Sequence, residues 1–169
     1  KLKNLSIQQP KAGFCFSPAT DLTRQGESFI SNKSSDVLLD FKTMVTWKDE
    51  YLNGHSETDP FASALFGDLS GLPPILIHVS SAELLYDDSV RFIDKAIESN
   101  VRVTYRIWHD LQHVWQLFFD FLPEARESLE EVNSFINSEF EPHILRVASG
   151  IKVLKFLHWC VILDKKGVV

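Results

Sequence analysis

Blocks of apolar residues separated by polar segments predict three short strands in this chain. The run Gly13–Phe16 is apolar and stops at Ser17-Pro18, which is typical of a buried strand followed by a turn. Ile75–Val79 is dense in β-branched residues and predicts a second strand. Residues 101–107 alternate apolar and polar side chains and predict a third.

Three helices are predicted from caps and helical periodicity. Asp40 can cap a helix whose apolar residues fall mainly on one side and which stops at Asn53-Gly54. A second helix is expected to open at Asp87 or Asp88, and Pro123 suits the first residue of a third. This alternation of strands and helices predicts an α/β fold with a parallel sheet.

The length, composition and net charge of the chain limit its domain organisation and its partners. The 169 residues are 44% apolar and 24% charged, enough for one domain with a core. The net charge of −6 gives no field that would attract nucleic acid. We divide the chain into a polar N-terminal segment, 1–12, a domain, 13–140, and an apolar-basic tail, 141–169. The longest uncharged run of the tail, Phe156 to Leu163, is far shorter than the roughly 20 residues that span a bilayer.

The cysteines and the N-terminal residues indicate in which cellular compartment the protein is expected. Cys15 and Cys160 lie far apart without metal-ligand spacing, which favours thiols in a reducing compartment. Residues 1–10 lack the apolar core of a signal peptide. We therefore expect a cytoplasmic protein. The chain starts with Lys1 and its one methionine is Met44, so we expect a fragment of a longer protein.

Candidate chemistry gathers in the two loops that follow the second and third predicted strands. One loop offers the carboxylate of Glu83 and the other the imidazole of His113. An imidazole that moves protons at neutral pH needs an acidic partner on its other nitrogen. Taken alone, Glu83 could equally be a solvated loop carboxylate, and Asp87 and Asp88 are fallback acids whose position suits helix capping.

The same loop contains a pair of histidines that could bind a metal ion. His109 and His113 are four residues apart, but the sequence supplies no clear third ligand. We predict no metal.

Three segments, in order along the chain, resemble the bacterial branch of the hormone-sensitive-lipase family of carboxylesterases. They are the SPxxDLT stretch Ser17–Thr23, the stretch Asp68–Pro74 and the run from Trp108 to Arg126. Together with the loop that carries Glu83, these segments cover most of residues 13–137. The resemblance implies the C-terminal portion of an α/β-hydrolase fold, with about three parallel strands and flanking helices.

The resemblance assigns His113 as the catalytic histidine. The family's acid loop commonly reads GSxE or GSDE; here Ser80 replaces the glycine and Ala82 the possible aspartate, which leaves Glu83 as the triad acid. Beside His113, apolar side chains are candidates for the wall of an acyl pocket, with core packing as the alternative. These candidate substrate-binding residues are Val114, Trp115 and Phe118.

The family's nucleophile is not found in this sequence. Its HGGG oxyanion-hole motif and G-x-S-x-G elbow precede the SPxxDLT stretch, and nothing before Ser17 contains either. Gly54-His55-Ser56-Glu57-Thr58 begins like an elbow, but it lacks the final glycine and follows a predicted helix. We therefore expect the serine to come from a missing N-terminal half.

The sequence is compatible with two functions. The resemblance implies hydrolysis of short- to medium-chain esters or lactones without metal or cofactor, and pairing of two copies through the strand at 101–107. Alternatively, the chain is a non-catalytic remnant that acts as an interaction module, its tail covering a sheet edge, touching a membrane surface or binding a partner.

Overall fold

The computed structural model describes residues 5–140, 160–164 and 167–168. The elements in chain order are β1 Ala12–Phe16, α1 Ser28–Ser31, α2 Phe41–Leu52, the 3₁₀ helix η2 Ala64–Phe66, β2 Ile75–Ser80, α3 Tyr86–Glu98, β3 Val103–Trp108, the 3₁₀ helix η3 Trp115–Phe118, α4 Pro123–Glu139, β4 Cys160–Asp164 and β5 Gly167–Val168.

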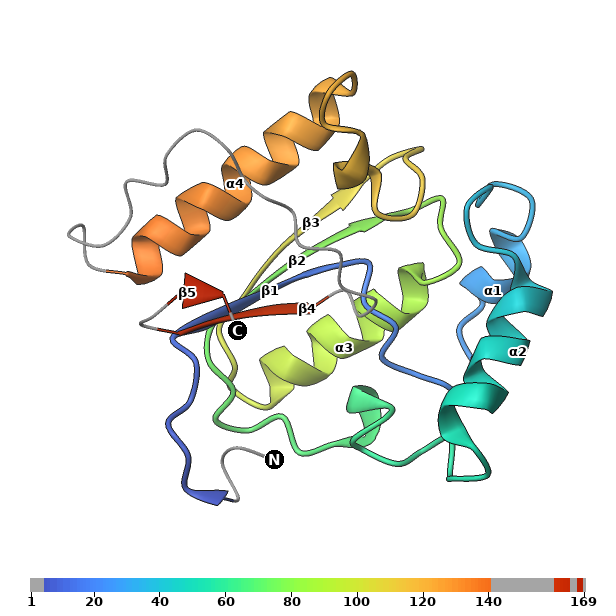
Figure 1. Ribbon diagram of the computed structural model, residues 1–169, viewed down its shortest axis with the longest axis horizontal. Coiled ribbons are helices and arrows are strands. Elements are labelled where there is room, and N and C mark those ends of the chain that lie inside the picture. Colours follow the sequence, from blue (N-terminus) through green and yellow to red (C-terminus); the bar gives the residue numbers. More distant parts are fainter. Residues whose placement is uncertain (1–4, 141–159, 165–166, 169) are drawn as a thin grey trace.

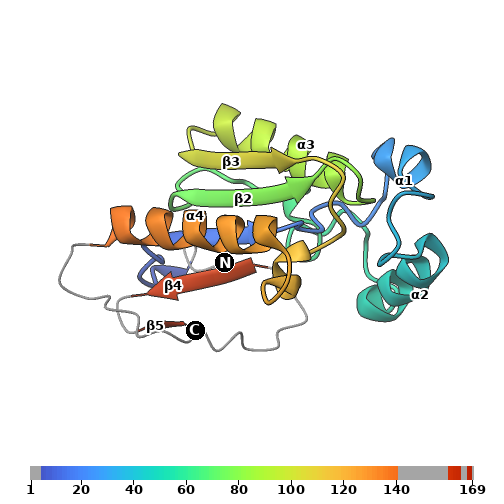
Figure 2. The same ribbon diagram turned by 90° about the horizontal axis from the view of Figure 1, so that it is seen from above.

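One sheet organises these elements, with the strand order β3-β2-β1-β4-β5 (Figures 1 and 2). β1, β2 and β3 run parallel, which confirms the predicted α/β class with three parallel strands. β4 pairs antiparallel with β1, and β5 antiparallel with β4. Because β1, β2 and β3 are parallel, their carboxyl ends meet at one edge of the sheet.

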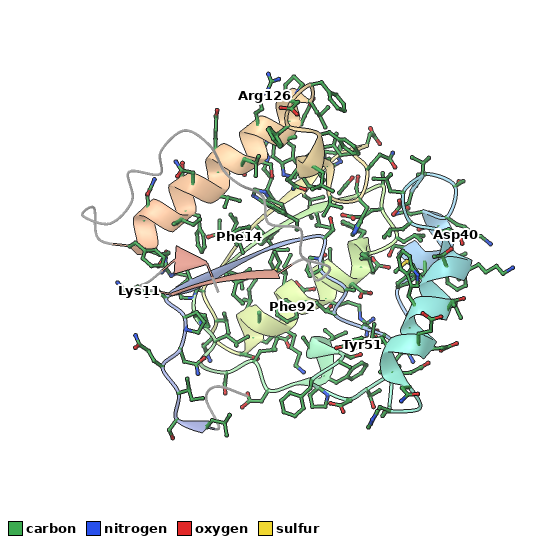
Figure 3. All side chains as sticks on the ribbon, in the orientation of Figure 1. Lys11, Phe14, Asp40, Tyr51, Phe92 and Arg126 are labelled. Atoms are coloured by element: carbon green, nitrogen blue, oxygen red, sulfur yellow. The ribbon has the colours of Figure 1, made fainter. Side chains whose placement is uncertain are left out.

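Helices cover both faces of the parallel strands, and this explains the continuous apolar run of β2. Ile75 and Ile77 face α3 and pack in a cluster with Phe92. Leu76 points the other way and packs in a cluster that Phe14 joins under α4. Figure 3 labels Phe14 and Phe92. A strand buried on both faces has no polar side to show, so all six residues of β2 are buried.

Two of the predicted helix starts are confirmed. The carboxylate of Asp40 accepts a hydrogen bond from the Thr43 amide at 2.8 Å, and Asn53, directly after the last residue of α2, is left-handed with a φ of 44°. Pro123 is the first residue of α4. The apolar side predicted for α2 is only partly covered: Leu52 is buried, whereas Trp47 is 59% and Tyr51 55% exposed.

The predicted start of α3 was wrong. The helix begins at Tyr86, and no side chain caps it. Asp87 accepts a hydrogen bond from the Ser28 amide, 59 residues earlier, at 2.8 Å. Asp88 likewise bonds the distant amides of Thr20 and Asp21. Both carboxylates therefore join loops to the helix instead of capping it.

The third strand also differs from its predicted bounds, because β3 starts two residues later, at Val103. Asn100 turns the chain with a φ of 59°, and the Val101 amide donates to the Ala96 carbonyl at 2.9 Å. Val101 is buried beside α3 and ends the turn. The apolar character that predicted a strand at Val101 belongs to this turn.

Among the described residues, no helix combines the length and apolar character needed to cross a bilayer. The cytoplasmic location stays a prediction.

Asp88 ties the turn after β1 to α3. Its Oδ2 accepts hydrogen bonds from the Thr20 and Asp21 amides, each at 2.9 Å, and its side chain is fully buried. Burial raises the pKa of Asp88 to about 7 because the charged form loses its water, although the two amides act in the opposite direction.

Because of this raised pKa, we predict that Asp88→Asn changes the free energy of unfolding by an amount that depends on pH. The folded chain holds the Asp88 proton more tightly than the unfolded chain, so the stability contribution of Asp88 is fully present below pH 4 and is lost as the pH rises from about 4 to about 7. Asparagine keeps an oxygen for the two amides and does not ionise. Relative to wild type, its free energy of unfolding should rise across this window by on the order of 2–4 kcal/mol. Urea unfolding at several pH values measures it; a constant difference between the two proteins would contradict the assignment.

Candidate active site

The loops that follow β2 and β3 lie side by side at the carboxyl edge of the sheet. Ser80, the last residue of β2, is in register with Trp108, the last of β3, and the Ser81 amide donates to the Trp108 carbonyl at 2.8 Å. Glu83 follows three residues after Ser80, and His113 five residues after Trp108. The parallel register therefore brings the two candidate side chains to the same place.

Glu83 and His113 form a buried pair. Nδ1 of His113 lies 2.7 Å from Oε2 of Glu83, and the two residues are 2% and 0% exposed. A carboxylate only accepts hydrogen bonds, so Nδ1 is the donor. In the neutral imidazole this places the basic lone pair on Nε2, the arrangement that a catalytic histidine requires.

The second oxygen of Glu83 is held by two further donors. Oε1 accepts from the Ser17 hydroxyl at 2.8 Å and from the Ser80 amide at 2.7 Å. Ser17 is fully buried and left-handed, with a φ of 48°. Its hydroxyl donates to the acid of the pair, whereas a nucleophile would donate to the imidazole. Ser17 therefore supports Glu83 and is not placed as a nucleophile.

The loop that carries His113 has an unusual backbone. Asp110 and Val114 have φ values of 57° and 48°, and such a conformation is rare for a β-branched residue. Several contacts hold this loop: the Leu111 amide donates to the Ser80 hydroxyl at 3.1 Å, and the Gln112 amide oxygen accepts from the Val37 amide at 2.9 Å. Strained backbone persists where the surroundings fix it in this way, and it often does so at functional sites.

The candidate pocket residues are largely buried in the core. Trp115 is 0% exposed and packs its ring 5.6 Å from that of Trp108. Val114 is 4% exposed, and Phe118 is half-buried against the same cluster. Trp115 therefore has a packing role here, and Phe118 is the most accessible of the three.

Other candidates from the sequence lie outside this pair. His109 is exposed, with Nδ1 3.4 Å from the Ser81 hydroxyl, and within residues 5–140 and the two C-terminal strands no three His, Cys, Asp or Glu side chains gather as a metal ion would require. Ser56 is exposed in the turn after α2, where its hydroxyl bonds that of Thr58 at 2.9 Å. This placement supports the expectation that Ser56 is not on a nucleophile elbow.

A second Ser-His-Glu arrangement lies under α4 and was not predicted. Nδ1 of His78 is 2.7 Å from the Ser128 hydroxyl, and Nε2 is 3.0 Å from a carboxylate oxygen of Glu131. Both His78 and Ser128 are 0% exposed, so no ester can reach them. Burial lowers the pKa of His78 to about 4, against the opposite effect of Glu131, which makes this imidazole a weak base. The arrangement joins β2 to α4 inside the core.

Comparison with known sequences identifies the family of this fold. A profile described as the alpha/beta hydrolase fold matches residues 1–117. An acetyl-hydrolase of Streptomyces hygroscopicus is 35% identical over 137 residues, 81% of this chain and 46% of that protein. An esterase of Acinetobacter venetianus is 35% identical over 139 residues, 82% of this chain and 46% of that protein.

Solved structures give the same result. An esterase from the bacterial hormone-sensitive lipase family superposes with a TM-score of 0.81 at 33% identity, covering 83% of this chain and 47% of that one. A hormone-sensitive lipase from a metagenome library gives 0.79 at 32% identity, covering 82% and 47%.

This chain belongs to the α/β-hydrolase fold family, and its relatives are esterases of the hormone-sensitive-lipase type. It spans about half the length of the curated relatives that it matches.

The pair predicts a tautomer switch in Glu83→Gln. The amide oxygen of glutamine can accept from Ser17 and Ser80, which turns its NH₂ group toward Nδ1 of His113. Nδ1 must then accept, so the imidazole proton moves to Nε2. Nitrogen-15 chemical shifts of the ring distinguish the two tautomers. In an assembled esterase the same change should lower kcat by about 10⁴-fold.

Glu131→Gln is the matched control, because Glu131 lies beside His78 and not beside Glu83. It should leave the His113 resonances unchanged. An identical His113 tautomer in wild type and Glu83→Gln would show that the carboxylate does not set it.

Proposed function

We propose that this chain supplies the acid and the base of a serine carboxylesterase whose nucleophile lies in an N-terminal half. Residues 13–140 form the C-terminal half of the catalytic domain, after the segment 1–12 and before the tail 141–169. The observation that carries the proposal is the buried hydrogen bond of 2.7 Å between His113 and Glu83.

The chemistry follows from that bond. A serine hydroxyl attacks the carbonyl carbon of an ester, and Nε2 of His113 takes the hydroxyl proton as the new carbon–oxygen bond forms. The imidazolium is stabilised by Glu83 and returns the proton to the departing alcohol, which leaves an acyl-serine. Water then attacks the acyl group by the same proton route and releases the carboxylic acid. No metal or cofactor takes part in these steps.

The names of the relatives indicate the substrate class. One is an acetyl-hydrolase and another an esterase, so we propose short- to medium-chain esters or lactones. The apolar residues beside His113 are proposed to shape the acyl site, with Phe118 as the accessible side chain and Val114 and Trp115 as its support. Their burial suits an apolar acyl group more than a charged one.

A chimera tests the proposal. The N-terminal half of the Streptomyces acetyl-hydrolase, joined ahead of this chain, should restore hydrolysis of p-nitrophenyl butyrate. His113→Ala should lower kcat in that chimera by about 10⁴-fold or more, because the nucleophile loses its base. The chain alone should not hydrolyse the ester, since an acid and a base without nucleophile and oxyanion hole do little.

Ser128→Ala in the chimera is the matched control, because Ser128 contacts the second, buried histidine. It should leave the activity within a few-fold of the parent. A folded chimera without activity, or with activity that survives His113→Ala, would contradict the proposal.

A second candidate function is a non-catalytic interaction module. The pairing of β4 with β1 favours it, because the edge of β1 is occupied by a strand of this same chain. Most of the tail, 141–159, lies outside the described residues, as does the proposed contact of the tail with a membrane or a partner. Hydrolysis by the chimera separates the two candidates, since a module that has lost its chemistry would give none.

We also propose pairing of two copies through β3. This strand ends the sheet, and Thr104 and Tyr105 are exposed on it. An edge strand with open hydrogen-bonding groups can pair with its copy. The carbonyls of Arg102 and Trp108 accept hydrogen bonds on the β2 side, so the alternate residue Tyr105 turns its amide to the open side of the strand. Light scattering should give a dimer for the whole chain and a monomer for Tyr105→Pro; a monomer in both would contradict this pairing.

A further inference from the structure

We propose that Ser80 is a positioning residue. It joins the loop that carries His113, residues 109–114 (the histidine loop), to the loop that carries Glu83, residues 81–85 (the acid loop), and so fixes His113 against Glu83. This inference rests on the proposed function. It concerns a serine at the position where the family resemblance expects glycine.

Ser80 contacts both loops at once. It ends β2 and is 0% exposed. Its amide donates to Oε1 of Glu83 at 2.7 Å. Its hydroxyl oxygen accepts from the Leu111 amide at 3.1 Å, across the site, and from the Ala82 amide at 3.2 Å, within the acid loop. One side chain therefore joins the backbone two residues before His113 to the backbone one residue before Glu83.

The histidine loop needs such an acceptor. Asp110, directly before Leu111, and Val114, directly after His113, are both left-handed. The free-energy cost of this backbone has to be offset by contacts that hold it, and an amide inside the protein needs an acceptor. A glycine at position 80 would keep the amide bond to Glu83 but would leave Leu111 without this acceptor.

The consequence is specific to the reaction. Loss of the Leu111 bond frees the loop to shift and so changes the position of the imidazole relative to both the acid and the attacking serine. Alignment of a base matters in the transition state, whereas Trp115 and Phe118 of the proposed acyl site are held by packing in the cluster with Trp108 and not by Ser80. The hydroxyl of Ser80 should therefore affect kcat and leave KM nearly unchanged.

The test uses the whole chain with Ser80→Ala and Ser80→Gly. Both variants keep the amide bond to Glu83 and remove only the hydroxyl contacts. The matched control is Ser89→Ala, since Ser89 is also 0% exposed and its hydroxyl has no hydrogen-bond partner among the described residues. In both Ser80 variants the Leu111 amide should exchange with solvent about tenfold faster, and the Nδ1–H resonance of His113 should shift and broaden. Ser89→Ala should change neither.

In the chimera, Ser80→Ala should lower kcat by about 10- to 100-fold at nearly constant KM. Ser80 variants that leave the Leu111 exchange rate and the His113 resonance as in wild type would overturn the inference, as would a KM effect without a kcat effect. An inactive parent chimera would count against the proposed function alone, because the exchange and resonance measurements on this chain still decide the role of Ser80. If Ser80→Ala fails to fold, Ser80→Gly carries the same comparison.

Discussion

The structure depends on how one buried carboxylate is satisfied. Glu83 is 0% exposed, and a charge out of water needs hydrogen-bond donors on both oxygens. Three donors supply them: Ser17 directly after β1, Ser80 at the end of β2 and His113 in the loop after β3. Each parallel strand thus contributes one donor, so the sheet register itself positions the acid and, through it, the imidazole.

The strands, the cap of α2 and the two facing loops can be predicted from the sequence, because each is determined by residues that lie close together in the chain. Apolar runs mark the strands, Asp40 caps α2 within four residues, and motifs in family order place Glu83 and His113 in facing loops. Ser17 and Ser80 were not predicted as donors to Glu83, because a serine in a turn has many partners within reach and tertiary contact selects one. The same reason explains Asp88, which reads as a helix cap and instead bonds amides 67 and 68 residues away.

The hydrogen bond between Glu83 and His113 forms within a chain that covers about half the length of its relatives. Within the described part of the chain, the donors to the Glu83 carboxylate are Ser17, Ser80 and His113. The pair does not require the nucleophile in order to form, and this separation is what the proposed function exploits: one half fixes the base, and the other has to bring the serine and the oxyanion hole to it. The His78–Ser128 contact shows that residue types alone do not make such a site, because complete burial denies it a substrate.

The central claim is that His113 activates a serine outside the residues of this chain. A fluorophosphonate probe, which bonds covalently to an activated serine, tests it on the chimera with the adduct located by mass spectrometry. We predict one adduct per chain, on the elbow serine of the added half, formed far more slowly after His113→Ala. An adduct on a serine of this chain, or labelling that proceeds unchanged without His113, would contradict the account.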